Sequence, residues 1–232
     1  GNAINTTANL TVNTSASLAL AAQNLTVGST FSNEGTVSLQ GSETVTLTQD
    51  VDSGTWRYEG DGTGAATTHT VIDFGATDYY NLIIEDASAS NDDTFQAGAA
   101  LTIANDLSVT DGTLDLNGQA TAIANDISIA AAGAATAGAS TITVDGNWSN
   151  AGAFTAGTSS VTLDGDDQSI IGTTTFASLE KVAKTGGSTL TMDDTGVTTI
   201  STSLKLDGAT GDVLTIVSDN PGTPHVINMA SG

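Results

Sequence analysis

The heptapeptide STITVDG at residues 140–146 returns further along the chain as SSVTLDG at residues 159–165. Two more pairs of segments repeat at almost the same distance. GTVSLQG (35–41) returns as GTWRYEG (54–60), and IANDLSV (103–109) returns as IANDISI (123–129). A fixed period of about twenty residues is typical of solenoids, in which each repeat is one structural unit stacked on the last.

Each repeat unit has the pattern of a short strand followed by a turn. In LDLNG (114–118), apolar and polar residues alternate and are followed by Asn-Gly. The same pattern ends at Gly146, Gly165 and Gly208. Period-two alternation predicts a half-buried strand, and Asx-Gly predicts a turn that needs a positive φ. The many Thr and Gly residues disfavour helix, so we expect almost no α-helix.

The fixed period favours an all-β fold, a parallel β-helix with coils of about 19–21 residues, over a β-sandwich. We expect residues 1–232 to form one elongated domain of about eleven coils. Its parts are residues 1–27 (N-terminal strands and an assembly end), 28–139 (first repeat block) and 140–232 (second repeat block and C-terminal strands). Asn105 should lie over Asn125, either in an amide ladder or as a simple turn residue. The alternative fold is a pilin-like β-sandwich completed by a donated strand, with residues 1–14 as the donor.

The charge balance excludes several classes of partner. The chain has 26 acidic and 4 basic residues, a net charge of −22 and no cysteine. Nucleic acids and anionic membrane surfaces are therefore excluded as direct partners, and so are disulfides and thiolate chemistry. No apolar stretch is long enough to insert into a membrane. Copies of the chain should repel one another unless salt or divalent cations screen the charge.

The N-terminal sequence bears on where in or outside the cell the protein is located. The chain begins at Gly1 with no basic segment followed by an apolar one. We expect either that a leader has been removed or that this is a piece of a longer chain. Both cases fit a secreted protein that is extracellular or on the cell surface.

The second repeat block resembles a known kind of protein. GNWSNAGAFTAGTSSVTLDG (146–165), followed by QSIIG (168–172) and FASL (176–179), is similar to the Thr/Gly-rich repeats of large bacterial cell-surface proteins of the adhesin or stalk type. The match is good over 146–180, weaker over 28–84 and absent at both ends. It departs at Leu163, where those repeats have an aromatic residue, and at Ser178, where they have Asn. The resemblance implies an exported β-helical stalk or adhesin region, and it brings no catalytic motif.

Residues suited to catalysis are scarce. His69 and His225 are far apart in sequence, and no nucleophile-elbow motif is present. A polysaccharide hydrolase could use two carboxylates, and the adjacent pairs are Asp92–Asp93, Asp166–Asp167 and Asp193–Asp194. Uronate-cleaving enzymes generally need basic residues, which this chain lacks. We expect no enzyme activity and no required cofactor.

The densest acidic segment is DGDDQS at residues 164–169. Asp164, Asp166 and Asp167 offer the hard oxygen ligands that calcium prefers, and a divalent ion would relieve repulsion between stacked acidic turns. The alternative is that these carboxylates are simply hydrated.

Two features concern glycans. Sequons for N-glycosylation occur at Asn5, Asn9, Asn13, Asn24 and Asn147, although a chain so rich in Thr and Ser also produces them by chance. The aromatic residues Trp56, Tyr58, Tyr79, Tyr80 and Trp148 either stack on sugar rings or anchor the core.

The function that fits best is that of an extracellular structural subunit, a homo-oligomer that assembles head to tail into a fibre, sheath or surface layer. The sequence shows no recognisable cap at either end, and uncapped solenoid ends pair with other strands. One alternative is a glycan- or surface-binding adhesin stalk fragment that uses the insertion between Gly60 and Tyr80. The least favoured is a hydrolase with an Asp pair.

Overall fold

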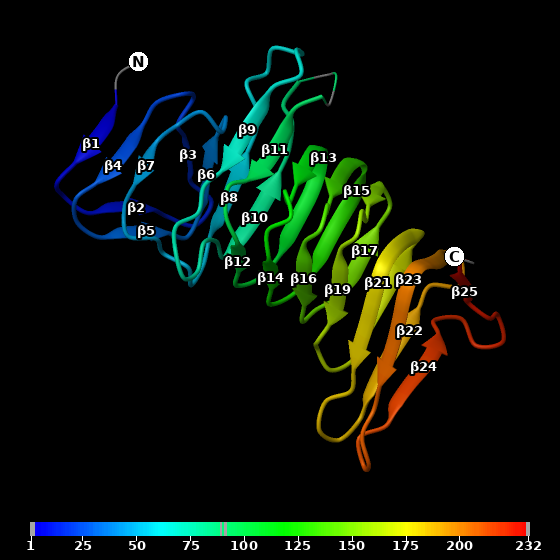
Figure 1. Ribbon diagram of the computed structural model, residues 1–232. Coiled ribbons are helices and arrows are strands. Elements are labelled where there is room, and N and C mark those ends of the chain that lie inside the picture. The colour runs from blue at the N-terminus through cyan, green and yellow to red at the C-terminus, as the bar shows by residue number, and fades with distance from the viewer. Residues whose placement is uncertain (1–2, 89, 91, 231–232) are drawn as a thin grey trace.

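The protein is a parallel β-solenoid. The computed structural model describes residues 3–88, 90 and 92–230, in which all the regular elements are strands. The strands stack into a rod of about 10 turns that runs from the N-terminal to the C-terminal end (Figure 1). At a spacing of about 4.8 Å per coil, the rod is roughly 50 Å long. The predicted parallel β-helix is confirmed, and the alternative sandwich is excluded because sandwich sheets are antiparallel.

Each coil has three sides, which we call faces one, two and three in the order in which the chain passes through them from Leu10 onward. Face two is continuous from one end to the other and consists of β3 (Ser17–Ala19), β6 (Thr36–Leu39), β8 (Thr55–Tyr58), β10 (Asn81–Ile84), the first halves of β13 (Leu107–Asp115) and β15 (Ile127–Thr136), β17 (Trp148–Asn150), β20 (Gln168–Gly172), β22 (Ser188–Met192) and β24 (Leu214–Ser218).

The other two faces are interrupted. Face one consists of β2 (Leu10–Val12), β5 (Phe31–Asn33), β12 (Leu101–Ile103), β14 (Thr121–Ile123), β16 (Thr141–Val144), β19 (Ser160–Leu163) and the second halves of β21 (Thr174–Val182) and β23 (Val197–Asp207). Face three consists of β1 (Ile4–Thr6), β4 (Leu25–Val27), β7 (Val45–Thr46), β9 (Thr68–Val71), β11 (Thr94–Ala97), the second halves of β13 and β15, β18 (Ala153–Thr155), the first halves of β21 and β23, and β25 (Val226–Met229).

The repeats found in the sequence are the pairs of strands that stack in the structure. Their registers are Thr36 with Thr55, Ile103 with Ile123 and Thr141 with Ser160. The coil length varies more widely than the repeats predict. The coil that brings Ser178 onto Ser160 is shorter than the repeat period, whereas the coil that brings Val226 onto Val197 is much longer. The longer coils carry their extra residues in loops between the strands.

Glycine at the predicted turns has two different roles. Asn117 and Gly118 have positive φ angles of 52° and 73°, as the Asx-Gly pattern predicts. Gly146, Gly165 and Gly208 do not have positive φ, and the prediction is wrong at these three positions. A Cβ on Gly165 would lie 1.7 Å from the carbonyl oxygen of Asp145, so this glycine is required because the preceding coil passes so close.

Asn105 and Asn125 stack as predicted, since the N–H of Asn125 donates to the carbonyl of Asn105 at 3.1 Å. Their amides do not bond to each other. Asn105 donates to Oδ1 of Asn81 at 2.8 Å, and Asn125 donates to Oδ1 of Asp106 at 2.7 Å. The observed ladder lies at or next to the start of five consecutive face-two strands, where a side-chain oxygen accepts the N–H of the same position in the next coil. Its steps are Asn81 to Asp106, Asp106 to Asp126, Asp126 to Asn147 and Asn147 to Ser169.

The core is a column of alternate residues that point into the rod. On face two, Leu82 is fully buried, and its strand lies between those of Trp56 and Leu107, with which it is in register. Burial of one such side chain contributes about 1.5–3 kcal/mol. The stability of the rod thus depends on each coil covering the apolar residues of its neighbours.

Replacing Leu82 by Ala should lower the free energy of unfolding by about 2–5 kcal/mol, because the rigid coils on both sides leave a cavity. The matched control is Ile171→Ala on the outer surface of β20, where the side chain is 46% exposed and a change within about 0.5 kcal/mol is expected. Urea denaturation of both variants measures the difference. Equal effects would contradict the assignment of Leu82 to the core column.

Candidate functional site

Two strands and their loops protrude from the rod near its middle. β9 and β11 pair in parallel and extend to one side (Figure 1). β9 lies within the insertion predicted between Gly60 and Tyr80, and the loop before β11 packs against the loop before β9. The sequence repeats could not predict the loop before β11, because this loop has no counterpart elsewhere in the chain.

A buried carboxylate joins the two protruding loops. Oδ1 of Asp93 accepts the N–H of Thr67 at 2.9 Å, and its Oδ2 lies 3.0 Å from Nε2 of His69. The side chains of His69 and Asp93 are 4% and 1% exposed, and the His69 ring stacks on Phe95. His69 is therefore a structural partner of Asp93. His225 is not brought near it, since its ring bonds to Asp193 and Thr198.

The buried carboxylate of Asp86 stabilises the loop before β11 by hydrogen bonds to other residues of that loop. Its carboxylate accepts the N–H groups of Ser88 and Asp93 at 2.7 and 3.0 Å, and the hydroxyl of Ser88 at 2.9 Å. Burial acts to raise the pKa of Asp86, but these hydrogen bonds to the charged form outweigh it, and the pKa lies below the usual 3.8. The loop is thus stabilised by an ionised carboxylate.

Carboxylates gather at two places among the described residues. Oxygen atoms of Asp86, Asp92 and Asp93 lie within 4.8 Å of one another, and so do those of Asp193, Asp194 and Asp219. Such groups are common on proteins without an ion. The sequence pattern pointed instead to Asp164, Asp166 and Asp167.

The structure gives Asp164, Asp166 and Asp167 three different partners. Asp164 contacts Nζ of Lys184 at 2.8 Å, Asp166 accepts the hydroxyl of Ser188 at 3.1 Å, and Asp167 accepts the N–H of Thr189 at 2.7 Å. The calcium site at these residues stays a prediction. The positive charges closest to these carboxylates are those of Lys181 and Lys184.

Lys181 occupies the inside of the same turn. Its Nζ donates to the carbonyls of Gly165 and Asp166 at 2.6 and 2.9 Å and to Oε1 of Gln168 at 2.7 Å. The side chain is fully buried. Burial lowers the pKa of Lys181, the charge of Lys184 adds to this, and the nearby aspartates oppose it. The buried ammonium thus stabilises the turn through two backbone carbonyls and the side-chain oxygen of Gln168.

The predicted glycan features fall into two groups. Asn5, Asn9, Asn13 and Asn24 are exposed, whereas the amide of Asn147 belongs to the ladder and donates to Asp126 at 3.0 Å. Glycosylation stays a prediction at all five. Trp56, Tyr58, Tyr79 and Trp148 are at most 1% exposed, so they anchor the core, and Tyr80 is partly exposed.

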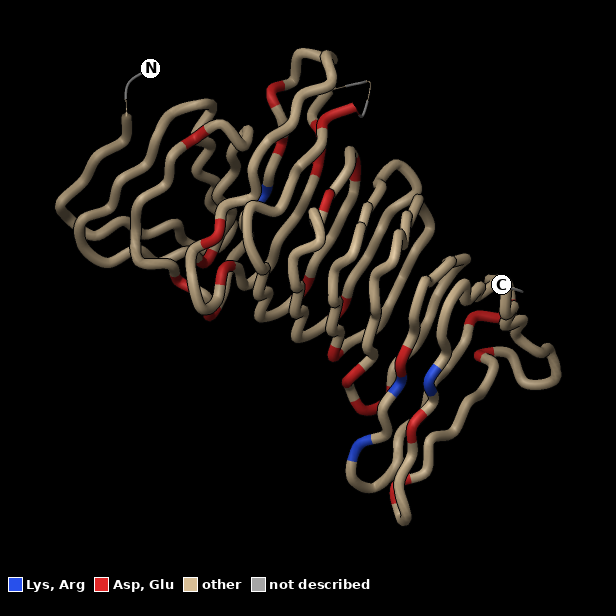
Figure 2. Tube along the Cα trace, viewed as in Figure 1, with Lys and Arg blue, Asp and Glu red and all other residues tan. Residues whose placement is uncertain are grey.

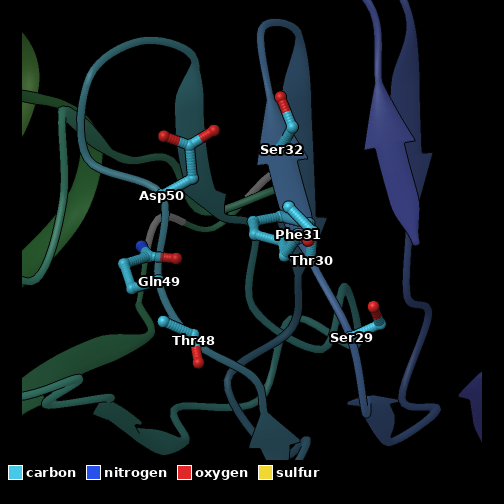
Figure 3. Close-up of a pocket in the computed structure, with 7 residues that line it drawn as sticks. All are labelled: Ser29, Thr30, Phe31, Ser32, Thr48, Gln49 and Asp50. Carbon is cyan, nitrogen blue, oxygen red and sulfur yellow. The ribbon is translucent and has the colours of Figure 1, made fainter. Parts of the chain in front are cut away.

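A groove of about 520 Å³ lies where face one has no strand in the third coil (Figure 3). Its lining consists of Ser29, Thr30, Phe31, Ser32, Thr48, Gln49 and Asp50. Asp50 accepts the N–H of Asn33 at 2.9 Å and so covers the edge of β5. The groove has one ionisable residue and therefore no pair of groups for acid–base chemistry.

Among the three predicted Asp pairs, Asp193 lines a groove together with Asp219 and Ser169. Hydrogen bonds from Thr195 and Gly172 hold the pKa of Asp193 below its usual value. A glycosidase needs one carboxyl group with a raised pKa to act as the general acid. Asp193 is therefore poorly suited to that role.

The last coil leaves its inward-pointing residues uncovered. Ile216, Ile227 and Met229 are 41%, 36% and 55% exposed, although the residues beneath them in the preceding coil, Leu190, Thr198 and Ile200, are at most 1% exposed. At the other end, Ile4, Leu10 and Leu18 of the first coil are only partly buried. In the described chain, both end coils therefore leave part of their apolar side chains exposed.

The fold and these features define a β-solenoid with an acidic side wall and two open apolar ends. No protein-family model matches the chain, and no curated protein or solved structure matches it. The resemblance to bacterial cell-surface repeats therefore stays a prediction. In the described part of the chain, no helix has the length and apolar character needed to cross a membrane.

The Lys181→Met variant tests the internal ammonium. It should lose about 2–4 kcal/mol of unfolding free energy, because the carbonyls of Gly165 and Asp166 and Oε1 of Gln168 each lose a charged donor. Lys205→Met is the control, since Lys205 forms its ion pairs with Glu180 and Asp207 at the surface and should matter far less. Urea denaturation compares the two, and a Lys181 variant as stable as the control would contradict the role assigned to it.

The Asp86→Asn variant should be less stable than the wild type at pH 7. Because the folded pKa of Asp86 lies below 3.8, its stabilising effect is fully present above 3.8 and is lost as the pH falls through the folded pKa. The gap between the two proteins should therefore close in acid. Urea unfolding between pH 7 and pH 2 measures it, with Asp92→Asn as the neighbouring control, and a gap independent of pH is the contrary result.

Proposed function

We propose that the protein is an extracellular structural subunit that assembles end to end into a surface fibre, sheath or layer. The observation that carries the proposal is the uncovered column of apolar residues in the last coil. A solenoid buries its core by stacking one coil on the next, so an uncovered coil is a surface on which a further coil can stack. Burial of such residues is the main driving force of association.

The side wall of the rod supports association along the axis. Acidic residues are spread over most of its length, and the few basic residues lie mainly in its C-terminal half (Figure 2). Two rods lying side by side would repel each other at low ionic strength. Single-rod fibres are therefore favoured at low salt, and sheaths or layers need screening by salt or divalent cations.

Other functions have less support from the geometry. The aromatic side chains that an adhesin would offer to a sugar are mostly inside the rod. The pKa of Asp193 is lowered, whereas a general acid needs a raised pKa. The absence of cysteine, the acidic composition and the resemblance to surface repeats all support export.

The assembly is tested by incubating the purified 232-residue chain at micromolar concentration and examining it by negative-stain electron microscopy and sedimentation. The expected result is filaments one rod wide at low salt, which associate laterally as the salt concentration rises. Monodisperse monomers across this range of salt would contradict the proposed function.

A further inference from the structure

We propose that the outer edge of β9 binds an extended segment of a partner protein, with a basic side chain at each end of the bound stretch. The segment adds one strand to face three, next to β9 and within the side wall of the rod. This site does not depend on how rods assemble, so the inference goes beyond the proposed structural role. It rests on a break in face three, on the unpaired backbone of β9 and on the charges at the two ends of that strand.

Face three is interrupted between two consecutive coils. Among the described strands, β7 pairs only with β4, and β9 pairs only with β11. On face two, by contrast, the strands β8 and β10 of the same two coils are paired with each other. Figure 1 shows β7 and β9 apart. One edge of β9 therefore has no strand beside it, although the preceding coil is present.

The free backbone groups belong to Thr68 and Thr70. The carbonyl of Thr67 accepts the N–H of Thr94 in β11 at 2.8 Å. Because successive residues of a strand direct their backbone groups to opposite sides, the N–H and C=O groups of Thr68 and Thr70 point to the open edge. No hydrogen bond among the described residues reaches these four groups, and both side chains are exposed. Such main-chain groups supply the affinity when a peptide adds a strand to a sheet.

The chain caps a comparable edge elsewhere. On face one, β5 pairs only with β2, and its residues line the groove of Figure 3. There the carboxylate of Asp50 accepts the N–H of Asn33 at 2.9 Å, and the hydroxyl of Ser53 donates to the carbonyl of Asn33 at 3.1 Å. Natural edge strands are also protected by Lys, Pro or a bulge. β9 has none of these, and no described side chain caps the backbone of Thr68 or Thr70.

An acidic side chain lies at each end of the open edge. The carboxylate of Asp61 accepts the hydroxyls of Thr63 and Thr67 at 2.7 and 3.1 Å, which places it beside the residue before β9. The hydrogen bond from the Thr63 hydroxyl contributes most to holding the pKa of Asp61 below its usual value. Asp73 follows β9 by two residues and is exposed. A bound strand therefore meets negative charge at both of its ends.

The chain has no free basic group among the described residues near these carboxylates. The first 180 residues contain a single Lys or Arg, Arg57, which pairs with Glu59 and Glu85 at 2.5 and 3.4 Å. Acidic residues mark the protruding loops in Figure 2. A second copy of the chain, with its net charge of −22, would bring like charges together at this edge, whereas a basic segment is attracted. The charge thus favours a basic partner over a second copy.

The two carboxylates and the preceding coil define the bound segment. Thr67, which Asp61 contacts, is six residues before Asp73, or about 20 Å of extended chain. Gly41 packs on the inner side of β9, because a Cβ on Gly41 would lie 2.5 Å from Cβ of the buried His69. The inward-pointing residues of the segment must therefore be small. The site fits about seven residues that begin and end with Lys or Arg.

Binding is tested with the fluorescently labelled peptide KTATATK, titrated with the intact chain at low salt and followed by fluorescence anisotropy. The peptide has the same sequence in both directions and so fits either polarity. DTATATD is the matched control, and reversing both end charges should weaken binding by at least about tenfold. The affinity for KTATATK should also fall as the salt concentration rises. Equal affinity for the two peptides would overturn the inference.

Backbone pairing is tested by N-methylation of KTATATK, which removes donors without changing its charge. In an antiparallel pair, the threonines of the peptide lie opposite Thr68 and Thr70 and exchange hydrogen bonds with them, whereas in a parallel pair the alanines donate. Methylation of one of these two sets should weaken binding by at least about tenfold, and the sensitive set gives the polarity. Strand addition is overturned if both methylated peptides bind as well as the parent.

Variants of the chain locate the site. Thr70→Pro removes a donor from the open edge without removing a hydrogen bond to β11, and it should abolish binding, whereas Thr70→Ala keeps the N–H and should bind as the wild type does. Asp73→Lys should weaken the binding of KTATATK several-fold. Glu34→Lys, the same charge change on an exposed residue at the corner between faces one and two, should have much less effect. The Asp73 variant still tests the site if the Pro variant fails to fold.

The outcomes are separable from those of the proposed function. Single rods and filaments should bind the peptide alike, so a chain that binds KTATATK but forms no fibre contradicts the assembly alone. Filaments that bind KTATATK no better than DTATATD contradict this inference alone. Sedimentation at high salt decides between a partner and a second copy, since a dimer that Thr70→Pro disrupts would assign the edge to a second copy and overturn the basic partner.

Discussion

The rest of the structure depends on the backbone hydrogen bonds between one coil and the next. These bonds require each strand to find a parallel neighbour about one coil away in the chain, and they set the period of about twenty residues. They also bring residues of the same position into contact, as in the ladder that begins at Asn81. The same requirement leaves one unpaired strand edge on the first and on the last described coil, and the proposed assembly rests on this feature.

The parts that follow from period and alternation could be predicted from the sequence. Thr36 over Thr55 and Thr141 over Ser160 are pairings that the repeats identify. The protruding loop around Asp86 could not be found in this way, because it occurs once and has no repeat. Lys181 was missed for another reason. Alternation with Leu179 places it inside the rod, but a lysine is ordinarily assigned to the surface, and its three oxygen partners come from a turn that is distant in sequence.

Acidic side chains and exposed apolar side chains lie on different parts of the surface. Acidic residues are spread along the side wall, although Asp86 and Asp93 are buried where they hold the protruding loops, while the last coil exposes Ile227 and Met229. The net charge of −22 thus opposes lateral contacts without opposing axial ones. Repulsion between side walls is therefore compatible with the proposed end-to-end assembly, because the two involve different surfaces.

The proposed function requires the rods to associate end to end, with their axes along the filament. In such a filament the strands lie perpendicular to the filament axis. X-ray diffraction from oriented filaments should therefore give a reflection at about 4.8 Å along that axis. A spacing of about 4.8 Å found only across the filament axis would show that the rods associate by their side walls, and would contradict end-to-end assembly.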